Sequence, residues 1–506
     1  MSYSINSDIF REYDIRGIAE TDLTSPVVEI LGRGFAAYLK PKGISAVTVG
    51  YDARLSSPRL CDDIVRGLTS AGLDVTILDL CPTPALYFSL YHLDPGAGVM
   101  ITGSHNPAEF NGFKLCVGKE TIYGEEIQKL KRIMETARSS RLIVAAETVG
   151  KEADLSSSLV VHRDANNKLP ATSYDLRVVS HPIMPDYIAY LKNQFNSNSG
   201  PRLKVVLDSG NGTAGLAAPE IIRAMGCEVI ELFSEPDGKF PNHHPDPTVP
   251  KNLVALIDAV RTQKADAGIA FDGDADRIGV VDEKGNILWG DQLMVIFSRD
   301  ILRERPGATF VSEVKCSQTM YDDIRAHGGN AVMWKTGHSL IKAKMKELHA
   351  ALAGEMSGHM FFADRYFGYD DAIYAACRMV EILKKLKSAE GPAAMLSMLT
   401  TDLPKTFNTP EIRFDCPDNI KFKVVEKAKE VFVRGNDLPQ KPKEVITVDG
   451  VRAIFDKGWG LVRASNTQPV LVMRFEAIDP VSLDAIKTMM EKKVETIIAE
   501  IRTARS

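Results

Sequence analysis

One pattern of strand and helix occurs three times in this chain, and each copy ends in a loop of reactive side chains. The expected strands are 46–50, 74–80 and 97–101 in the first copy, 204–208, 228–232 and 267–271 in the second, and 308–312, 331–334 and 350–353 in the third. The helix within each copy ends before a glycine, at Gly72, Gly226 or Gly328, as helices commonly do. Strands that alternate with helices predict mostly parallel sheets with right-handed connections. Three copies in tandem therefore predict three related mixed α/β domains.

The rest of the chain predicts a fourth domain of a different kind. Beyond the proline-punctuated stretch 399–415 we expect a helix near 420–434, strands at 445–455 and 470–477, and a closing helix from 480 to 502. This order is that of a smaller C-terminal α+β domain. A length of 506 residues agrees, since a domain commonly has about 150 residues.

The expected domain boundaries follow from these patterns. The first domain, 1–184, includes a polar stretch at 139–174 that is interpreted as an insertion. The second spans 185–292, the third 293–403 and the fourth 404–506. Ligands of open α/β sheets bind beyond the carboxyl ends of the strands. We therefore expect the loops that follow the third strand of each copy to face one central cleft.

Composition and charge exclude several classes of function. A net charge of −5 lacks the basic footprint of a nucleic-acid-binding protein. No apolar run approaches the roughly 18 residues that span a membrane, and charged residues from Asp8 to Asp14 interrupt any secretory signal. The 7 cysteines are widely spaced and are interpreted as reduced core residues. We expect a cytoplasmic protein with small-molecule ligands.

The loop of the first copy carries a serine in the turn Thr102-Gly-Ser-His-Asn-Pro107. Gly103 permits tight backbone geometry, Pro107 stiffens the exit, and His105 is adjacent to Ser104. A free serine hydroxyl is a poor nucleophile and needs an activator or a reactive group already attached. An ordinary polar turn is the alternative; the matching position of the other two loops favours a functional serine.

The loop of the second copy places Asp272, Asp274 and Asp276 within five residues. Carboxylates so close together repel one another, and hard oxygen ligands of this kind suit Mg²⁺ or Ca²⁺. An EF-hand is excluded because Arg277 occupies the position that requires glycine and because the flanks read as strands. A divalent-cation site is predicted, with a plain acidic turn as the alternative.

Two further loops contain groups that suit sugar hydroxyls and phosphate. Glu355, Ser357 and His359 alternate, so their side chains share one face of an extended segment and offer donors and acceptors to hydroxyls. The loop Arg463-Ala-Ser-Asn-Thr-Gln-Pro469 combines a guanidinium, hydroxyls and an amide, which could hold a phosphate. A serine, a cation site, a hydroxyl-binding loop and an anion-binding loop together favour phosphoryl transfer.

These motifs resemble those of the α-D-phosphohexomutase family, and within it the bacterial phosphomannomutase/phosphoglucomutase branch. The resemblance covers nearly the whole chain except 139–174. It depends on TGSHNP, DGDADR, GEMSGH and RASNTQP in the family's order, and FREYDIRG (10–17), NGFK (111–114) and KTGHSLIK (335–342) reinforce it.

The resemblance implies a role for each matching residue. Ser104 would carry the phosphoryl group and, with Asp272, Asp274 and Asp276, bind one Mg²⁺ per chain. The catalytic set would comprise Ser104, His105, Lys114, His338 and Arg16, with Lys114 and His338 as candidates for proton transfer. The substrate-binding set would comprise Tyr13, Arg277, Lys315, Glu355, Ser357, His359, Arg463, Ser465, Asn466 and Thr467.

The expected reaction interconverts hexose 1-phosphate and hexose 6-phosphate, with mannose and glucose as the sugars. A hexose 1,6-bisphosphate would be both activator and intermediate, and the protein would be a monomer or homodimer. Phosphoglucosamine mutase is the nearest alternative, and Met356 of GEMSGH distinguishes this chain from the GEQSGH typical of that branch. A serine-dependent phosphohydrolase and a non-catalytic sugar-phosphate-binding protein are further alternatives.

Overall fold

The computed structural model describes residues 5–139, 177–195, 200–436, 438–465 and 468–503. The insertion expected at 139–174 lies almost entirely outside the described residues. The chain forms two compact units, one of residues 1–281 with 371–388 and the other of 282–370 with 389–506. No helix in the described ranges has the length and hydrophobicity needed to cross a membrane.

The first unit begins with a mixed sheet of strand order β1-β5-β4-β2-β3-β7, in which β6 pairs with β5. Its strands are β1 (Ile15–Ile18), β2 (Ala46–Tyr51), β3 (Asp74–Leu80), β4 (Gly96–Ile101), β5 (Phe110–Val117), β6 (Glu120–Thr121) and β7 (Val178–Ser180). The helices of this part of the chain are α1 (Ser25–Leu39), α2 (Ser57–Ser70), α3 (Thr83–His92), α4 (Glu125–Ser139) and α5 (Met184–Gln194).

Alternation along β2 explains why this sheet carries helices on both faces. Val47 and Val49 belong to the apolar core that includes residues of α1, α2 and α4. Thr48 points to the opposite face, where Ser89 of α3 donates to its hydroxyl at 3.1 Å. Successive side chains of a strand face opposite sides, so a strand buried on both faces reads as almost continuously apolar.

The second sheet of this unit contains β11, β10, β8 and β9 in that order. The strands are β8 (Lys204–Asp208), β9 (Glu228–Leu232), β10 (Ala267–Phe271) and β11 (Ile278–Asp282), with helices α6 (Ala218–Ala224) and α7 (Val254–Gln263). The single helix expected before Gly226 is instead a short 3₁₀ turn, Thr213–Leu216, followed by α6.

Helix α11 (Ala372–Glu390) also belongs to the first unit, although it follows a long excursion of the chain. Its Lys387 pairs with Asp266, and the hydroxyl of Tyr187 donates to Asp371, just before the helix, at 2.9 Å. Residues 371–388 thus lie in the first unit although they fall within the range 293–403. Nothing in the sequence pattern of α11 distinguishes this return from a helix of the third copy.

The second unit contains the third copy and the C-terminal domain. The third copy forms a sheet of order β14-β13-β15-β16. The elements of this part of the chain are β12 (Ile287–Leu288), α8 (Gly290–Glu304), β13 (Thr309–Glu313), α9 (Gln318–Ala326), β14 (Asn330–Trp334), α10 (His338–Glu347), β15 (Leu352–Gly354) and β16 (Met360–Phe362), and β12 is not a strand of this sheet.

The C-terminal domain is an antiparallel sheet of order β17-β22-β21-β20-β19, with β18 also paired to β22, and two helices pack on it. Its elements are β17 (Phe407–Asn408), β18 (Ile412–Asp415), α12 (Asp418–Arg434), β19 (Glu444–Ile446), β20 (Val451–Phe455), β21 (Gly458–Ala464), β22 (Val470–Ala477) and α13 (Pro480–Thr503). The expected strand 445–455 is two strands, because Gly450, with φ of +82°, lies in the turn between them. Arg463, expected in a turn, lies within strand β21, next to its last residue.

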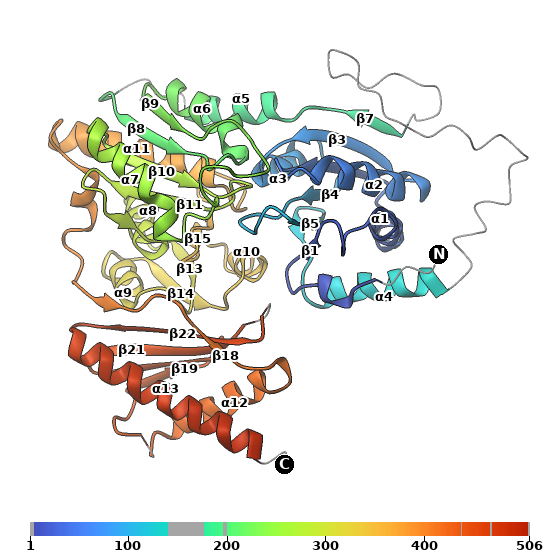
Figure 1. Ribbon diagram of the computed structural model, residues 1–506. Coiled ribbons are helices and arrows are strands. Elements are labelled where there is room, and N and C mark those ends of the chain that lie inside the picture. Colours follow the sequence, from blue (N-terminus) through green and yellow to red (C-terminus); the bar gives the residue numbers. More distant parts are fainter. Residues whose placement is uncertain (1–4, 140–176, 196–199, 437, 466–467, 504–506) are drawn as a thin grey trace, which may run out of the picture. The chain divides into compact units, whose positions relative to one another are not determined.

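The three copies share one arrangement, as the repeat predicts. Their strand orders are β4-β2-β3, β10-β8-β9 and β15-β13-β14, so in each the third strand pairs with the first (Figure 1). The strands within each copy are parallel. Each third strand then pairs with a further strand, β5, β11 or β16. The reactive loop of each copy connects these two strands at the carboxyl end of the third strand.

Candidate active site

The Ser104 loop of the first unit follows β4 directly. Ser104 is buried, with 2% of its surface exposed, and its φ is +48°, in the left-handed region. Its backbone N–H donates to Thr102 Oγ1 at 2.8 Å. A non-glycine residue held in this region costs about 1–3 kcal/mol, so it persists only where the surroundings hold it.

Ser104 meets the aspartate loop although 168 residues separate it from Asp272 in sequence. Its hydroxyl donates to Asp272 Oδ2 at 2.9 Å. A Cβ on Gly273 would lie 2.6 Å from the carbonyl oxygen of Ser104, so the two loops touch at backbone level. The structure therefore brings together the serine and the carboxylates that sequence placed in separate copies.

The three aspartates lie within a buried cluster. Asp272, Asp274 and Asp276 each present a carboxylate oxygen, and these oxygens lie within 4.8 Å of one another. Asp272 Oδ1 accepts the backbone N–H groups of Asp276 and Arg277, each at 3.1 Å. These bonds close the loop and turn the carboxylates toward one point.

Lys114 of β5 supplies positive charge to this cluster. Its ammonium donates to Asp274 Oδ2 at 2.8 Å and also to Asp276, and Thr83 donates to the same oxygen of Asp274 at 2.5 Å. Although burial acts to raise it, the pKa of Asp274 is held below its ordinary value by Lys114. Burial, with the charges of Asp276 and Asp274, raises the pKa of Asp272 well above its ordinary value.

The cluster fits a hard divalent cation. Asp274 Oδ1 is buried and, within the described part of the chain, has no hydrogen-bond donor. A buried carboxylate oxygen without a partner costs free energy, and a metal ion would satisfy it. Three carboxylates and a serine oxygen form a ligand set of the kind that Mg²⁺ prefers.

The other predicted residues of the first unit lie around these loops. His105 Nδ1 is 3.2 Å from Ser104 Oγ, and Arg277 Nε is 3.9 Å from Asp272 Oδ2. Arg16 of β1 pairs with Asp14 at 2.5 Å and stands opposite Gly112 in the register of β1 with β5. Tyr13 lies two residues before this strand and is half-buried.

The Glu355 loop of the second unit follows β15, and Glu355 and His359 within it are buried. Glu355, 4% exposed, accepts the N–H of Gly337 at 2.6 Å through Oε1. The Ser357 hydroxyl is 3.4 Å from Glu355 Oε2. The side chains of Glu355 and Ser357, which were predicted to share one face, are therefore in contact.

His359 and His338 both contact a residue that sequence reasoning missed, Asp370. His359 Nδ1 is 3.1 Å from Asp370 Oδ2, His338 Nδ1 is 3.9 Å from it, and the two rings stack with centroids 5.6 Å apart. Burial acts to raise the pKa of Asp370, but Lys342 and the two histidines hold it well below its usual range. A charged carboxylate therefore lies beside both imidazoles.

A cluster of charge surrounds Lys315 in the same unit. Its ammonium lies 3.4 Å from Glu313 and 3.3 Å from Glu411. Although burial acts to lower it, these two carboxylates raise the pKa of Lys315. The side chain therefore stays charged and can attract an anion.

The phosphate-binding loop predicted at 463–469 is tied to the third copy through Asp449. Arg463 Nε donates to Asp449 Oδ2 at 2.9 Å, and the N–H of Thr336 donates to the same oxygen at 3.0 Å. Ser465 is buried, and its hydroxyl accepts the N–H of Gln468 at 3.1 Å. Asn466 and Thr467 lie outside the described residues.

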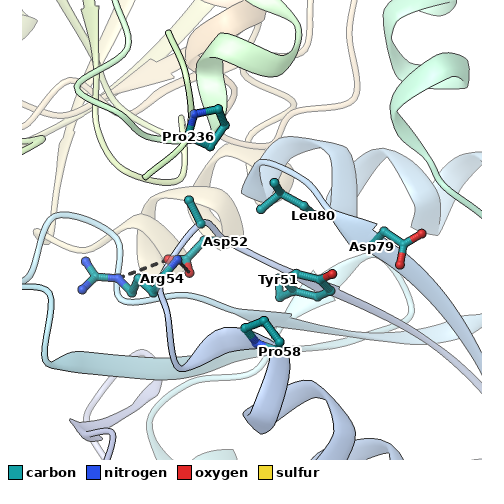
Figure 2. Close-up of a pocket in the computed structure, with 8 residues that line it drawn as sticks. Tyr51, Asp52, Arg54, Pro58, Asp79, Leu80 and Pro236 are labelled. Atoms are coloured by element: carbon teal, nitrogen blue, oxygen red, sulfur yellow. Dashed lines mark hydrogen bonds and ion pairs between the residues drawn. The ribbon is translucent and has the colours of Figure 1, made fainter. Parts of the chain in front are cut away.

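Sequence reasoning also missed Asp52 and Arg54, which lie beneath the Ser104 loop. Asp52 Oδ2 accepts the Thr102 hydroxyl at 2.9 Å and the Gly103 N–H at 3.1 Å. Both residues line a cavity of about 300 Å³ with Tyr51, Pro58, Asp79 and Pro236 (Figure 2). They follow the end of β2, so the rule that pointed to the other loops, ligand residues beyond strand ends, could have found them.

The site residues therefore form two sets, one in each unit. Ser104, the three aspartates and Lys114 come together in the first unit, and Lys315, Glu355, His359 and Arg463 belong to the second. A central cleft shared by all these loops would depend on how the two units are placed relative to each other, so it stays a prediction.

Comparison with known proteins establishes the family. Family models for phosphoglucomutase/phosphomannomutase match in order: alpha/beta/alpha domain I over residues 7–141, domain II over 185–285, domain III over 289–402 and the C-terminal domain over 411–493. The chain belongs to the phosphoglucomutase/phosphomannomutase family, which confirms the four-domain α/β architecture and the family resemblance.

Individual relatives cover almost the full length. A phosphomannomutase/phosphoglucomutase of Pseudomonas aeruginosa is 40% identical over 98% of this chain and 97% of its own, and a phosphoglucomutase of Neisseria gonorrhoeae is 41% identical over 97% and 98%. A phosphoglucomutase/phosphomannomutase family protein of Burkholderia thailandensis has a similar crystal structure, with a TM-score of 0.83, 35% identity and 98% coverage of both chains.

Proposed function

We propose that this protein is a phosphohexomutase that interconverts hexose 1-phosphates and hexose 6-phosphates through a phosphoserine and a hexose 1,6-bisphosphate. One observation carries the proposal: the Ser104 hydroxyl lies 2.9 Å from Asp272 within a buried carboxylate cluster. A serine has no ordinary reason to be buried against three carboxylates, whereas a phosphoserine that shares a divalent cation with them does.

The proposed reaction consists of two phosphoryl transfers, one from Ser104 to the sugar and one from the sugar to Ser104. The bond between Ser104 Oγ and phosphorus breaks as a sugar hydroxyl oxygen bonds to phosphorus, and the proton of that hydroxyl ends on Ser104 Oγ. The other phosphate of the resulting bisphosphate is then returned to Ser104. Lys114 is 4% exposed and, flanked by Asp274 and Asp276, stabilises charge on the transferring group.

Mg²⁺ is the proposed cation, held by Asp272, Asp274, Asp276 and Ser104. When bound it supplies positive charge that neutralises the phosphoryl oxygens. The carboxylates, Lys114 and the loop hydrogen bonds fix where that charge lies. A reaction with no redox step needs no further cofactor.

The second set of residues is proposed to recognise the sugar phosphate. Glu355 and Ser357 would bind hydroxyls common to both orientations of the intermediate, and the charged Lys315 and Arg463 would bind its non-reacting phosphate. Tyr13, Arg16, His338, His359, Arg277 and Ser465 are proposed to complete the site, together with Asn466 and Thr467. The boundaries 1–184, 185–292, 293–403 and 404–506, a cytoplasmic location and a monomer or homodimer remain proposals.

A coupled assay across sugar phosphates tests this function. With Mg²⁺ and catalytic hexose 1,6-bisphosphate, we expect glucose 1-phosphate and mannose 1-phosphate to give the 6-phosphates. Glucosamine 1-phosphate should be turned over at least about tenfold less efficiently, a difference of about 1.4 kcal/mol in transition-state binding. Preference for glucosamine 1-phosphate would favour the alternative mutase, and steady release of phosphate without isomer would favour a phosphohydrolase.

Metal binding gives a second prediction. Mg²⁺ at one hundred times its Kd should stabilise the wild-type protein by about 2.7 kcal/mol. Asp272→Asn should lose most of this gain. Without metal, the free energy of unfolding of Asp272→Asn should not be lower than that of wild type. The pKa of Asp272 is raised in the folded protein, so above about pH 4 its ionisation favours the unfolded chain. Asparagine cannot ionise and removes this cost.

Thermal unfolding with and without Mg²⁺ measures both effects. Asp258→Asn, at an exposed aspartate of α7, is the matched control and should keep the whole gain. Equal stabilisation of wild type and Asp272→Asn would show that Mg²⁺ binds elsewhere.

A further inference from the structure

Arg54 is buried beneath the Ser104 loop and uses its whole guanidinium there. It is 1% exposed, and its Nε donates to Asp52 Oδ2 at 3.2 Å. Its two terminal nitrogens donate to four backbone carbonyl oxygens, those of Ser104 at 2.8 Å, Asn106 at 2.6 Å, Pro107 at 2.5 Å and Phe110 at 2.9 Å. An arginine has five N–H donors in a planar fork, so this network matches its full capacity.

Asp52 and Arg54 hold the strained Ser104 from both sides. On the N-terminal side, Asp52 Oδ2 accepts the Thr102 hydroxyl, and Thr102 Oγ1 accepts the Ser104 N–H. On the C-terminal side, Arg54 binds the Ser104 carbonyl. The backbone of a residue with φ of +48° is thus fixed at its N–H and at its C=O. The direction of a side chain follows from its backbone, so the same contacts set where the hydroxyl points.

The guanidinium packs so closely against the loop that a glycine is needed at position 103. A Cβ on Gly103 would lie 2.4 Å from Arg54 Cζ. The ring of Phe240 lies 5.2 Å from Arg54 Cζ, and a Cβ on Gly238 would lie 2.5 Å from the carbonyl oxygen of Ala53. Segment 238–240 of the second copy therefore covers the guanidinium from outside the first sheet. A side chain larger than that of glycine at position 103 would therefore collide with the guanidinium.

We propose that Arg54 is a positioning residue that holds the Ser104 hydroxyl toward the aspartate cluster for phosphoryl transfer. This inference rests on the proposed function of Ser104 as the phosphoryl carrier. Arg54 itself contacts backbone carbonyls and Asp52, so it acts through the loop and not on the transferred group.

Replacement by lysine separates charge from geometry. Arg54→Lys keeps the positive charge beside Asp52, but three donors on a point-like ammonium cannot reach four carbonyls and a carboxylate. A displacement of the reacting oxygen by about 1 Å can cost about a hundredfold in rate. We expect Arg54→Lys to lower kcat about a hundredfold while the KM for glucose 1-phosphate changes less than about threefold, because the sugar-binding residues are untouched.

Hydrogen exchange measures how firmly Arg54 holds the Ser104 loop, independently of enzymatic activity. In Arg54→Lys and Arg54→Met, amides of 103–110 should exchange faster than in wild type, with the remaining peptides of the first sheet unchanged. Arg59 of α2 is the matched control, since its guanidinium also donates to backbone carbonyls, those of Leu23 and Ala19. Arg59→Lys should leave both kcat and exchange of 103–110 unchanged.

Chemical rescue supplies a readout that general destabilisation would not produce. Arg54 is one of the residues that line the cavity, and its replacement by alanine vacates the space that its guanidinium occupies (Figure 2). Added guanidinium ion, far below denaturing concentrations, should restore part of kcat to Arg54→Ala in a saturable way and should not raise that of Arg59→Ala. Methylammonium, which lacks the planar fork, should restore less.

The outcomes are distinguishable. A wild-type kcat for Arg54→Lys, or unchanged exchange at 103–110 in both variants, would overturn the positioning role. Absence of turnover in the wild-type protein would overturn the proposed function, and hydrogen exchange would still decide whether Arg54 holds the loop. Loss of kcat without rescue, accompanied by faster exchange throughout the first sheet, would show that Arg54 is only structural.

Discussion

Ser104→Ala should lower mutase turnover by about 10⁴-fold or more, because the only carrier of the phosphoryl group in the proposed reaction is then missing. The loss should appear in kcat for glucose 1-phosphate at saturating bisphosphate and Mg²⁺. Binding of glucose 1-phosphate, measured by calorimetry, should remain within about threefold of wild type, since the proposed sugar-binding residues lie elsewhere.

The fold of this variant should be retained. Alanine loses the hydrogen bond from the serine hydroxyl to Asp272 and its contact with His105 Nδ1, so the free energy of unfolding should fall by about 1–2 kcal/mol. Ser70→Ala, at the exposed end of α2, is the control and should keep full activity. Residual turnover of Ser104→Ala above one per cent of wild type would show that another group carries the phosphoryl.

Lys114→Met should have the largest effect on stability. Lys114 is the ammonium that contacts Asp274 and Asp276, and its removal leaves three carboxylates packed within 4.8 Å of one another. Breaking a buried ion pair by removing one partner typically costs about 3–5 kcal/mol. We expect a loss of that size in the metal-free protein, measured by denaturant unfolding, together with a loss of kcat of at least about a hundredfold.

Mg²⁺ should reverse part of this loss. The ammonium and a metal ion neutralise the same carboxylates, so the metal-linked gain in stability should be larger in Lys114→Met than in wild type. Lys119→Met is the matched control, because Lys119 follows the same strand but pairs with the exposed Asp94. Equal stability of the two variants without metal would contradict the role assigned to Lys114.

The repeat explains why so much of the fold could be predicted from sequence. Most ends of the nine expected strands lie within about one residue of the observed ends of β2, β3, β4, β8, β9, β10, β13, β14 and β15. Short apolar runs that are bounded by glycine or by polar turns predict buried strands with little ambiguity. β5 and β16 were missed in this pattern. β5 contains the polar residues Asn111 and Lys114, which are buried beside the site, so the sequence of this strand is not continuously apolar.

The site was predictable only where its residues are adjacent in sequence. Ser104, the three aspartates and Glu355 stand in compact motifs, and each follows a strand end. Asp370 and Asp449 each support a site loop from a distant position in the sequence, and no local pattern marks them. Asp52 and Arg54 follow the end of β2, so their place beyond a strand end was a signal. What they contact could not be predicted, because the acceptors of Arg54 are mostly backbone carbonyls, which leave no pattern in the sequence.

The most direct test of the central claim is to locate the phosphoryl group on the protein. Wild-type protein incubated with glucose 1,6-bisphosphate and Mg²⁺ should gain one phosphoryl group by intact mass. Peptide mapping should place it on Ser104, and glucose 1-phosphate should remove it and yield the bisphosphate. A protein that turns over substrate but has no phosphoryl group on Ser104, or has it on another residue, would contradict the account.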